Sequence, residues 1–341
     1  MAAYVPGEQP QDKKYVKLNT NESPFPTSKG VVKAIDKAKI QNLRLYCDPQ
    51  CKALKNQLAQ VYNTDAKNVF VSNGSDEILN FAFMAYGQNG VAFADITYGF
   101  YSVFCSLYGL KAEVIPLKED FSLDVDAFCG QNKLVVMANP NAPTGKDIPL
   151  EDIERILQSN PKSVVVIDEA YVDFGGKSCQ KLTEKYDNLL CVQTFSKSRS
   201  MAGARLGFAF ASEEIIKDLE KIKYSTNPYN VNRVSAGLGL GAILDKEYFS
   251  ENCKKIIENR DFTKEKLIEL GFTLTNSYSN FLFAKTDKIG GKQLYLKLKE
   301  NGILVRHFDS ERIRDYIRIT IGSKEQMQKF IEKTAKILEE I

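Results

Sequence analysis

Short apolar runs alternate with amphipathic segments through the first two thirds of this 341-residue chain. Each run is five or six residues long, a length typical of buried strands. The runs lie at 68–72, 90–94, 112–117, 133–138, 163–168, 189–194 and 206–211. Apolar residues with helical spacing lie among them, as at Leu54, Leu58 and Val61 and in the segment 150–158. Strands that alternate with helices predict an α/β fold with a mostly parallel central sheet flanked by helices.

The pattern changes near residue 213. Helical stretches are predicted at 213–223 and 231–270, and a charged amphipathic helix is predicted at 324–340. Strand-like segments lie between them at 280–285, 303–308 and 316–321. The stretch before residue 31 is rich in Pro, Asn and Lys, shows no sustained period, and predicts an extended arm. We therefore expect an arm at 1–30, a large α/β domain at 31–235 and a smaller C-terminal α+β domain at 236–341.

Charge and cysteine content limit the classes of partner and compartment. The chain has 46 Lys and Arg residues against 43 Asp and Glu residues, a balance too even to predict binding to nucleic acid or to a membrane surface. No apolar run approaches the roughly 18 residues of a membrane span, and the first residues lack the features of a secretion signal. We expect a cytoplasmic protein whose seven cysteines are reduced thiols.

The chain contains one histidine, His307. Histidine is the usual general base and metal ligand, so one histidine cannot supply both a catalytic triad and a metal site. Cys47 and Cys51 are four positions apart, but no second cysteine pair has zinc-site spacing. We therefore predict no metal site, and we expect any catalysis to use lysine, carboxylates or a cofactor.

Polar residues follow several predicted strands, which is where ligands bind in open α/β sheets. Ser75 and Asp76 follow the first strand and open a helix, so they form either an anion site or plain N-caps. Asp168 ends a later strand and is either a functional carboxylate or a loop cap. Lys197 follows another strand, where a desolvated amine can act as a nucleophile or form a Schiff base. Together with Arg205, these residues indicate a site for an anionic ligand at one edge of the sheet.

The combination of motifs resembles the pyridoxal-phosphate enzymes of the aspartate-aminotransferase fold. These motifs are NPNAPTG, IDEAY and TFSKS, followed by an arginine. The order agrees, and the interval of 29 positions from Asp168 to Lys197 is a usual one in that family. Further motifs at 18–25, 72–77, 97–99 and 316–322 are similar to those of histidinol-phosphate aminotransferases. The resemblance runs from Tyr4 to the last helix and makes the large domain the cofactor-binding one.

The resemblance implies pyridoxal 5′-phosphate as the cofactor, with Lys197, Asp168 and Tyr171 as catalytic residues. Lys197 would form a Schiff base with the cofactor and then move a proton to and from the substrate carbon. Asp168 would keep the pyridine nitrogen protonated, and Tyr171 would donate to the phenolic oxygen of the ring. Tyr98 would stack on the ring face. The residues that would bind the cofactor phosphate are Ser75, Asp76, Thr194, Ser196 and Arg205.

The resemblance also implies a substrate site and a homodimer. Arg318 would bind the anion next to the reacting carbon, and Arg306 would be a second arginine for the substrate phosphate. Tyr4 and Asn21 would come from the arm that covers the site. Tyr46 would reach the cofactor phosphate of the neighbouring subunit.

One position departs from the family pattern. An asparagine usually precedes Pro-Thr-Gly and bonds the ring oxygen of the cofactor, but Ala142 stands there in this chain. Either Asn141 or Asn139 could replace the contact, although the prolines in the turn leave little freedom for that. The sequence therefore leaves open whether the bond is made or missing.

The implied reaction moves an amino group between L-histidinol phosphate and 2-oxoglutarate, giving imidazole-acetol phosphate and L-glutamate, a step of histidine biosynthesis read backwards. An aromatic-amino-acid aminotransferase and an enzyme similar to threonine-phosphate decarboxylase are alternatives. A pyridoxal-phosphate-binding regulator is a further alternative, but it would need a DNA-binding module for which the chain has neither spare length nor a basic patch.

Overall fold

The central element of the fold is a seven-stranded sheet with the strand order β2-β8-β7-β6-β5-β3-β4. The computed structural model describes residues 3–35 and 40–341. Strand β8 is antiparallel to both of its neighbours, and the other neighbouring strands are parallel. The strands are β2 (Val69–Ser72), β3 (Val91–Ala94), β4 (Ala112–Ile115), β5 (Leu134–Ala138), β6 (Val165–Asp168), β7 (Leu189–Thr194) and β8 (Gly207–Ala211). The predicted α/β fold with a mostly parallel sheet is confirmed.

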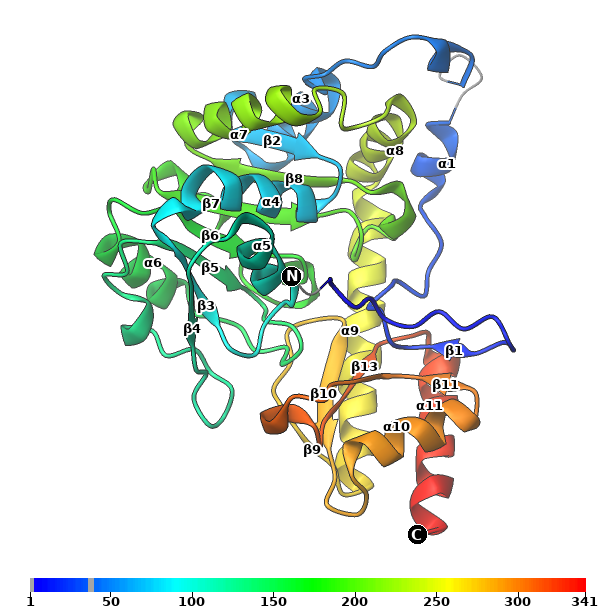
Figure 1. Cartoon of the computed structure of the whole chain (residues 1–341). Coiled ribbons are helices and arrows are strands. Elements are labelled where there is room, and N and C mark those ends of the chain that lie inside the picture. The colour runs from blue at the N-terminus through cyan, green and yellow to red at the C-terminus, as the bar shows by residue number, and fades with distance from the viewer. Residues whose placement is uncertain (1–2, 36–39) are drawn as a thin grey trace.

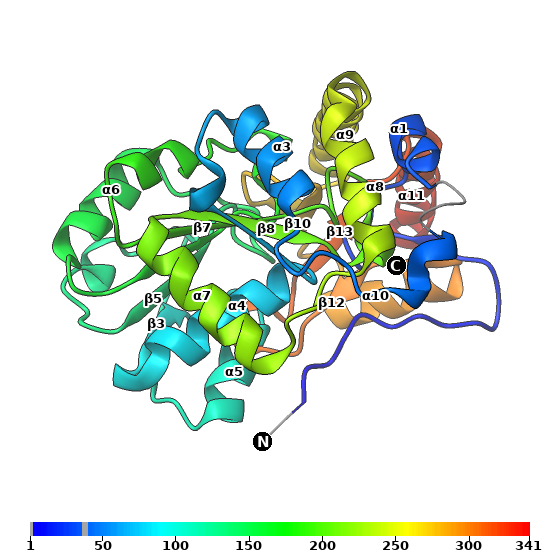
Figure 2. The ribbon, with the colours of Figure 1, turned by 90° about the horizontal axis from the view of Figure 1, so that it is seen from above.

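Helices cover both faces of this sheet. Side chains alternate along a strand, so in β6 Val165 and Ile167 enter one hydrophobic core whereas Val166 enters the other. Helices α3 and α6 pack on the first face, and α4, α5 and α7 pack on the second (Figure 2). Their bounds are α3 (Lys52–Tyr62), α4 (Ser75–Tyr86), α5 (Phe100–Tyr108), α6 (Leu150–Ser159) and α7 (Glu213–Thr226).

The C-terminal part contains a second, antiparallel sheet with the strand order β12-β13-β10-β9. These strands are β9 (Thr273–Leu274), β10 (Phe281–Lys285), β12 (Arg306–His307) and β13 (Ile317–Thr320). Leu282 and Ile319 pack with Phe330 in a third hydrophobic core. The neighbouring helices are α9 (Lys246–Glu269), α10 (Gly291–Glu300) and α11 (Lys324–Glu339). The seven-stranded sheet lies before the predicted boundary at residue 235, and the four-stranded sheet lies after it. The domain bounds 1–30, 31–235 and 236–341 stay a prediction.

The predicted helical stretch at 231–270 is two helices, α8 (Arg233–Leu244) and α9. The break is at Asp245, whose ψ of 69° is not helical. The Asp245 carboxylate accepts a hydrogen bond from the Gly30 backbone N–H at 3.4 Å. Gly30 belongs to α1 (Lys29–Lys33), which packs so closely on α8 that a Cβ on Gly241 would lie 2.4 Å from the Gly30 carbonyl oxygen.

The N-terminal arm is tied to the C-terminal part of the chain. Strand β1 (Val16–Lys17) pairs in parallel with β11 (Ile303–Leu304), and the two lie side by side in Figure 1. Leu18 continues the arm, and its carbonyl accepts a hydrogen bond from the backbone N–H of Thr320 at 2.9 Å. The predicted strand at 303–308 is thus two short strands, because β11 pairs with the arm and β12 pairs with β13.

Among the described residues, no helix has both the length and the apolar character needed to cross a membrane.

Candidate active site

The ends of several central strands meet around one cavity of about 160 Å³. Thr194 at the end of β7 pairs with Gly207 at the start of β8, which in turn pairs with Ser72 at the end of β2. Asp168 ends β6 at the same edge of the sheet. We call this space the inner cavity. The predicted residues that line it are Ser75, Asp76, Tyr98, Asp168, Tyr171, Thr194, Ser196, Lys197 and Arg205.

One end of the inner cavity presents groups that suit a phosphate. Helix α4 begins at Ser75 after Gly74, whose φ of 87° directs the chain into the turn, and free N–H groups at a helix N-terminus attract anions. Arg205 packs against this turn, since a Cβ on Gly74 would lie 2.7 Å from the Arg205 Nη2 atom. The Asp76 carboxylate accepts hydrogen bonds from Arg205 Nη2 at 3.0 Å and from the Tyr98 hydroxyl at 2.8 Å. This carboxylate therefore fixes the arginine and the tyrosine beside the anion-binding turn.

A buried carboxylate lies at the other side of the inner cavity. Asp168 is 5% exposed and accepts hydrogen bonds from the Tyr101 hydroxyl at 3.0 Å and from the Ala170 N–H at 3.3 Å. Burial raises its pKa to about 6, although the Tyr101 hydrogen bond opposes this rise. A carboxylate in this position can bind a protonated ring nitrogen.

Lys197 lies where the inner cavity opens into a larger space. Its Nζ atom is 5.7 Å from the centre of the Tyr171 ring, and its side chain lines both spaces. In the described parts of the chain, no carboxylate forms an ion pair with this amine. The amine is therefore placed to react with a ligand in either cavity.

The Tyr171 hydroxyl is oriented by the arm. Asn21 donates from Nδ2 to this hydroxyl oxygen at 3.0 Å, which leaves the phenolic proton available for a ligand. Asn21 is itself held by the Thr320 hydroxyl, which donates to Oδ1 at 2.9 Å, and by Asn280, which donates to its carbonyl oxygen at 3.1 Å. The arm and both sheets thus meet at one hydrogen-bonded group.

The larger space, the outer cavity, has a volume of about 720 Å³ and is lined by the predicted substrate residues Tyr4, Asn21, Arg306 and Arg318. Arg318 donates from Nη2 to the Asn19 carbonyl at 3.0 Å, while its buried Nε atom has no hydrogen-bond partner in the described structure. Burial lowers the Arg318 pKa. A guanidinium with an unused, desolvated donor suits an incoming anion.

Arg306 holds the arm over the outer cavity, a contact that the sequence did not predict. It donates from Nη1 to the Pro6 carbonyl at 3.1 Å and from Nη2 to the Val5 carbonyl at 3.2 Å. Next to these residues, the Tyr4 ring stacks on Phe100 with a centroid separation of 4.2 Å. Arg306 thus binds backbone carbonyls in this structure, and its predicted role toward a substrate phosphate stays a prediction.

In the turn at 139–145, neither neighbouring asparagine takes the place of the family asparagine that Ala142 replaces. The Asn141 amide donates to the Ile96 carbonyl at 2.9 Å and accepts from the Thr97 hydroxyl at 2.8 Å. The Asn139 amide oxygen accepts from the Ile148 N–H at 2.8 Å. Both asparagine side chains are therefore used inside the protein, whereas Ala142 lines both cavities.

Tyr46 does not belong to either cavity of its own chain. Its side chain is largely exposed, and its ring stacks on Tyr229 with a centroid separation of 4.4 Å. Its backbone carbonyl accepts a hydrogen bond from Arg233 at 2.8 Å. Of the predicted cofactor residues, Tyr46 is the one that the structure keeps apart from the rest.

The sequence interpretation assigned no role to two residues at the site. Tyr101 contacts Asp168, and no local signal could have identified it, because the two residues are 67 positions apart on different elements. Glu22 lines the inner cavity and forms an ion pair with Lys17 at 2.6 Å. Burial alone would raise the pKa of Glu22, but the contact with Lys17 lowers it.

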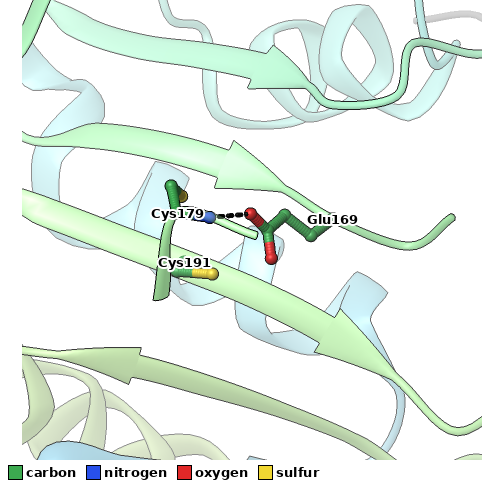
Figure 3. Close-up of side chains that lie close together, drawn as sticks. All are labelled: Glu169, Cys179 and Cys191. Atoms are coloured by element: carbon green, nitrogen blue, oxygen red, sulfur yellow. Dashed lines mark hydrogen bonds between the residues drawn. The ribbon is translucent and has the colours of Figure 1, made fainter. Parts of the chain in front are cut away.

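A second cluster of polar groups lies beside β6 and β7. Figure 3 shows Glu169, Cys179 and Cys191, whose possible ligand atoms lie within 4.8 Å of one another. The Glu169 carboxylate already accepts hydrogen bonds from the Cys179 N–H at 2.6 Å, the Ser178 hydroxyl at 2.6 Å and the Gln193 amide at 2.8 Å. Burial raises the pKa of the Cys191 thiol, and a protonated thiol is a poor metal ligand. We therefore interpret the cluster as a brace between β6 and β7.

Comparisons with known proteins show what this chain is similar to. The family model described as aminotransferase class I and II matches residues 13–333. A histidinol-phosphate aminotransferase of Brachyspira hyodysenteriae is 51% identical over 338 residues, covering 98% of this chain and 96% of the relative. One of Clostridium acetobutylicum is 49% identical over 332 residues, covering 97% and 94%. The crystal structure of histidinol-phosphate aminotransferase from Sinorhizobium meliloti in complex with pyridoxal-5′-phosphate superposes with a TM-score of 0.87 at 22% identity, covering 96% of this chain and 92% of that chain. That likeness shows a shared fold.

Proposed function

This chain belongs to the aminotransferase class I and II family, and we propose that it transfers the amino group of L-histidinol phosphate to 2-oxoglutarate, giving imidazole-acetol phosphate and L-glutamate. The observation that carries this proposal is the 51% identity, over nearly the whole chain, to a histidinol-phosphate aminotransferase. The outer cavity supports it, because two arginines border the space that Lys197 enters. The family resemblance found in the motifs is thereby confirmed.

Pyridoxal 5′-phosphate is the cofactor of this family, and the inner cavity fits it. The N–H groups of Ser75 and Asp76, the hydroxyls of Thr194 and Ser196, and Arg205 would hold the phosphate. When bound, the cofactor supplies an electron sink for the substrate carbon that loses its proton. The roles of these residues are part of our proposal.

The catalytic roles follow from what each side chain can do with a proton. Asp168 would hold a proton on the pyridine nitrogen, because a carboxylate next to a basic nitrogen favours its charged form. Tyr171 would donate to the ring oxygen, since its own oxygen already accepts from Asn21. Lys197 would bond the cofactor and afterwards carry the proton to and from the substrate carbon.

The substrate anion would bind to Arg318 in both half-reactions. Histidinol phosphate carries a phosphate where glutamate carries its α-carboxylate, and a guanidinium can bind either group. Arg306 would contact the phosphate as well, after exchanging its bonds to the arm carbonyls for bonds to the substrate. Tyr4 and the arm would then cover the bound substrate.

We further propose a homodimer located in the cytoplasm. Large apolar side chains are exposed on several elements, and the predicted inter-subunit residue Tyr46 is itself 79% exposed. Those next to it in the chain include Leu43 and Leu45, and Val32 and Leu244 lie on the contacting helices α1 and α8. Exposed large apolar side chains favour a protein–protein contact, and a second copy would bring Tyr46 to the neighbouring cofactor phosphate.

An amino-donor panel tests the reaction. Histidinol phosphate, phenylalanine, tyrosine and threonine phosphate are offered in turn with 2-oxoglutarate, and glutamate is measured; Lys197→Ala serves as the inactive control. We expect the highest kcat/KM with histidinol phosphate. Preference for an aromatic amino acid, or release of carbon dioxide from threonine phosphate without formation of glutamate, would contradict the proposal.

A further inference from the structure

Tyr101, which lines neither cavity, is hydrogen-bonded to the proposed catalytic carboxylate of Asp168. Tyr101 is fully buried in α5, and its hydroxyl donates to Asp168 Oδ2 at 3.0 Å. We propose that Tyr101 is a positioning residue whose phenol keeps the Asp168 carboxylate ionised and turned toward the pyridine nitrogen of the cofactor. This inference rests on the proposed function and extends it to a residue outside the cofactor contacts.

The fold places Tyr101 in one orientation. Its ring lies in the hydrophobic core that α4, α5 and α7 form on one face of the seven-stranded sheet. The ring centroid is 6.0 Å from that of Phe93 and 5.7 Å from that of Tyr98, to which the ring is edge-on. Asp168 points to the same face, because side chains alternate along β6 and Val166 lies in that core. A buried hydroxyl without a hydrogen-bond acceptor costs free energy, and the Asp168 carboxylate is the acceptor for Tyr101. The contact is therefore fixed from both sides.

The surroundings of Asp168 otherwise disfavour its charge. Burial raises its pKa to about 6, and the carboxylates of Asp76 and Glu169 add to this rise. Against it act the Tyr101 hydroxyl and the Ala170 N–H, and of the two only the hydroxyl belongs to a side chain that can be replaced. The other titratable groups of the inner cavity are Tyr98, Tyr171, Lys197, Arg205 and Glu22.

Removal of the hydroxyl should raise the Asp168 pKa. Loss of a hydrogen bond to a charged group shifts the pKa of that group by about one to two units. Tyr101→Phe should therefore move the Asp168 pKa from about 6 to roughly 7–8. Half or more of the carboxylate would then be neutral near neutral pH. A neutral carboxyl group no longer holds the proton on the pyridine nitrogen.

The first test uses the cofactor-free enzyme, so that it does not depend on substrate. The free energy of unfolding is measured by urea titration across a pH series. A folded-state pKa above the unfolded value of about 3.9 contributes stability that is present at low pH and is lost as pH rises through the folded pKa. In the wild type this loss should be complete near pH 6, whereas in Tyr101→Phe it should continue to a pH about one to two units higher. In an Asp168→Asn background the two profiles should run parallel.

The second test uses the holoenzyme. The acid limb of the kcat/KM profile for the glutamate half-reaction should move up by about one to two pH units in Tyr101→Phe. Tyr108→Phe is the matched control, because Tyr108 lies on the same helix and donates its hydroxyl to Asn80 at 2.6 Å, away from Asp168. This control should leave both profiles unchanged.

Replacement of Tyr101 by 3-fluorotyrosine keeps the size of the ring and makes the phenol a better donor, so it should move both profiles in the opposite direction. It also covers the case in which Tyr101→Phe does not fold. The proposal is overturned if both replacements leave the pH profiles of cofactor-free enzyme and holoenzyme at the wild-type positions, even if activity falls. Absence of histidinol-phosphate turnover would reject the proposed reaction but not this result, because the unfolding profiles need no substrate.

Discussion

Replacing Ala142 by asparagine should give the cofactor ring oxygen a second hydrogen-bond donor. Ala142 lines both cavities and is 7% exposed, and Tyr171 is the donor that the family resemblance assigns to this oxygen. A donor to the ionised oxygen favours the form with a negative ring oxygen and an unprotonated Schiff base at Lys197. Ala142→Asn should therefore lower the pKa of that Schiff base.

The size of the effect follows from the type of bond. A hydrogen bond to a charged group contributes about 1.5–3 kcal/mol, and one pKa unit corresponds to about 1.4 kcal/mol. The midpoint of a spectrophotometric pH titration of the bound cofactor should fall by roughly one to two pH units. The fall should approach about two pH units only if the new amide donates to no acceptor other than the ring oxygen. Thermal unfolding and cofactor affinity, measured in parallel, check whether the new side chain has disturbed the turn.

Two controls separate the donor from its side effects. Ala142→Leu adds a side chain of similar volume without a donor and should not lower the midpoint. Asn141→Ala should leave the midpoint unchanged, because the Asn141 amide is bonded to Thr97, Thr144 and the Ile96 carbonyl. If Asn141→Ala instead raises the midpoint and Ala142→Asn does nothing, Asn141 serves the ring oxygen and our reasoning about this turn is wrong.

Three further predictions concern the same site. Lys197→Ala should still bind pyridoxal phosphate but form no covalent bond to it, and borohydride reduction with peptide mass spectrometry should label Lys197 in the wild type; a label on another lysine would reject the assignment. Arg318→Ala should cost roughly 2–5 kcal/mol in kcat/KM for both half-reactions, whereas Arg306→Ala should impair mainly the histidinol-phosphate one; equal small effects would contradict the substrate model. Gly74→Ala should weaken cofactor binding, measured by fluorescence titration, because the φ is 87° and the new Cβ would meet the cradle arginine at 2.7 Å. Gly130→Ala, with a φ of 67° and no atom of a described residue within 4 Å of its new Cβ, should cost stability without changing that affinity.

The central sheet was predictable because buried strands are apolar on both faces. The run at 189–194 coincides with β7, and the others differ from their strands by at most two residues at an end. The run at 303–308 was a different case. It pairs with the arm through Ile303 and Leu304 and with β13 through Arg306 and His307, and no local pattern shows where a strand changes its partner.

The inner cavity was predictable for a related reason. Residues at the ends of neighbouring parallel strands must lie at one edge of a sheet, so the positions of Asp168 and Lys197 after such strands predict that they lie near each other. The contacts made by the arm could not. Arg306 binds the Val5 carbonyl across 301 positions, and Asn21 bonds Tyr171 across 150 positions. Such pairs depend on how the two large sheets and a terminal segment meet, which neither periodicity nor motif spacing encodes.

The pairing of β1 with β11 has a consequence for biosynthesis. Lys13 and its acceptor, the Glu300 carbonyl, are 287 positions apart. At about 5–20 residues per second, the ribosome needs roughly 15 to 60 s to make that stretch. The predicted phosphate cradle, which spans residues 75–205, can assemble on the nascent chain during this interval, but the arm has no strand to pair with until residue 303 has emerged. The nascent enzyme should therefore become able to hold its cofactor well before it can enclose a substrate.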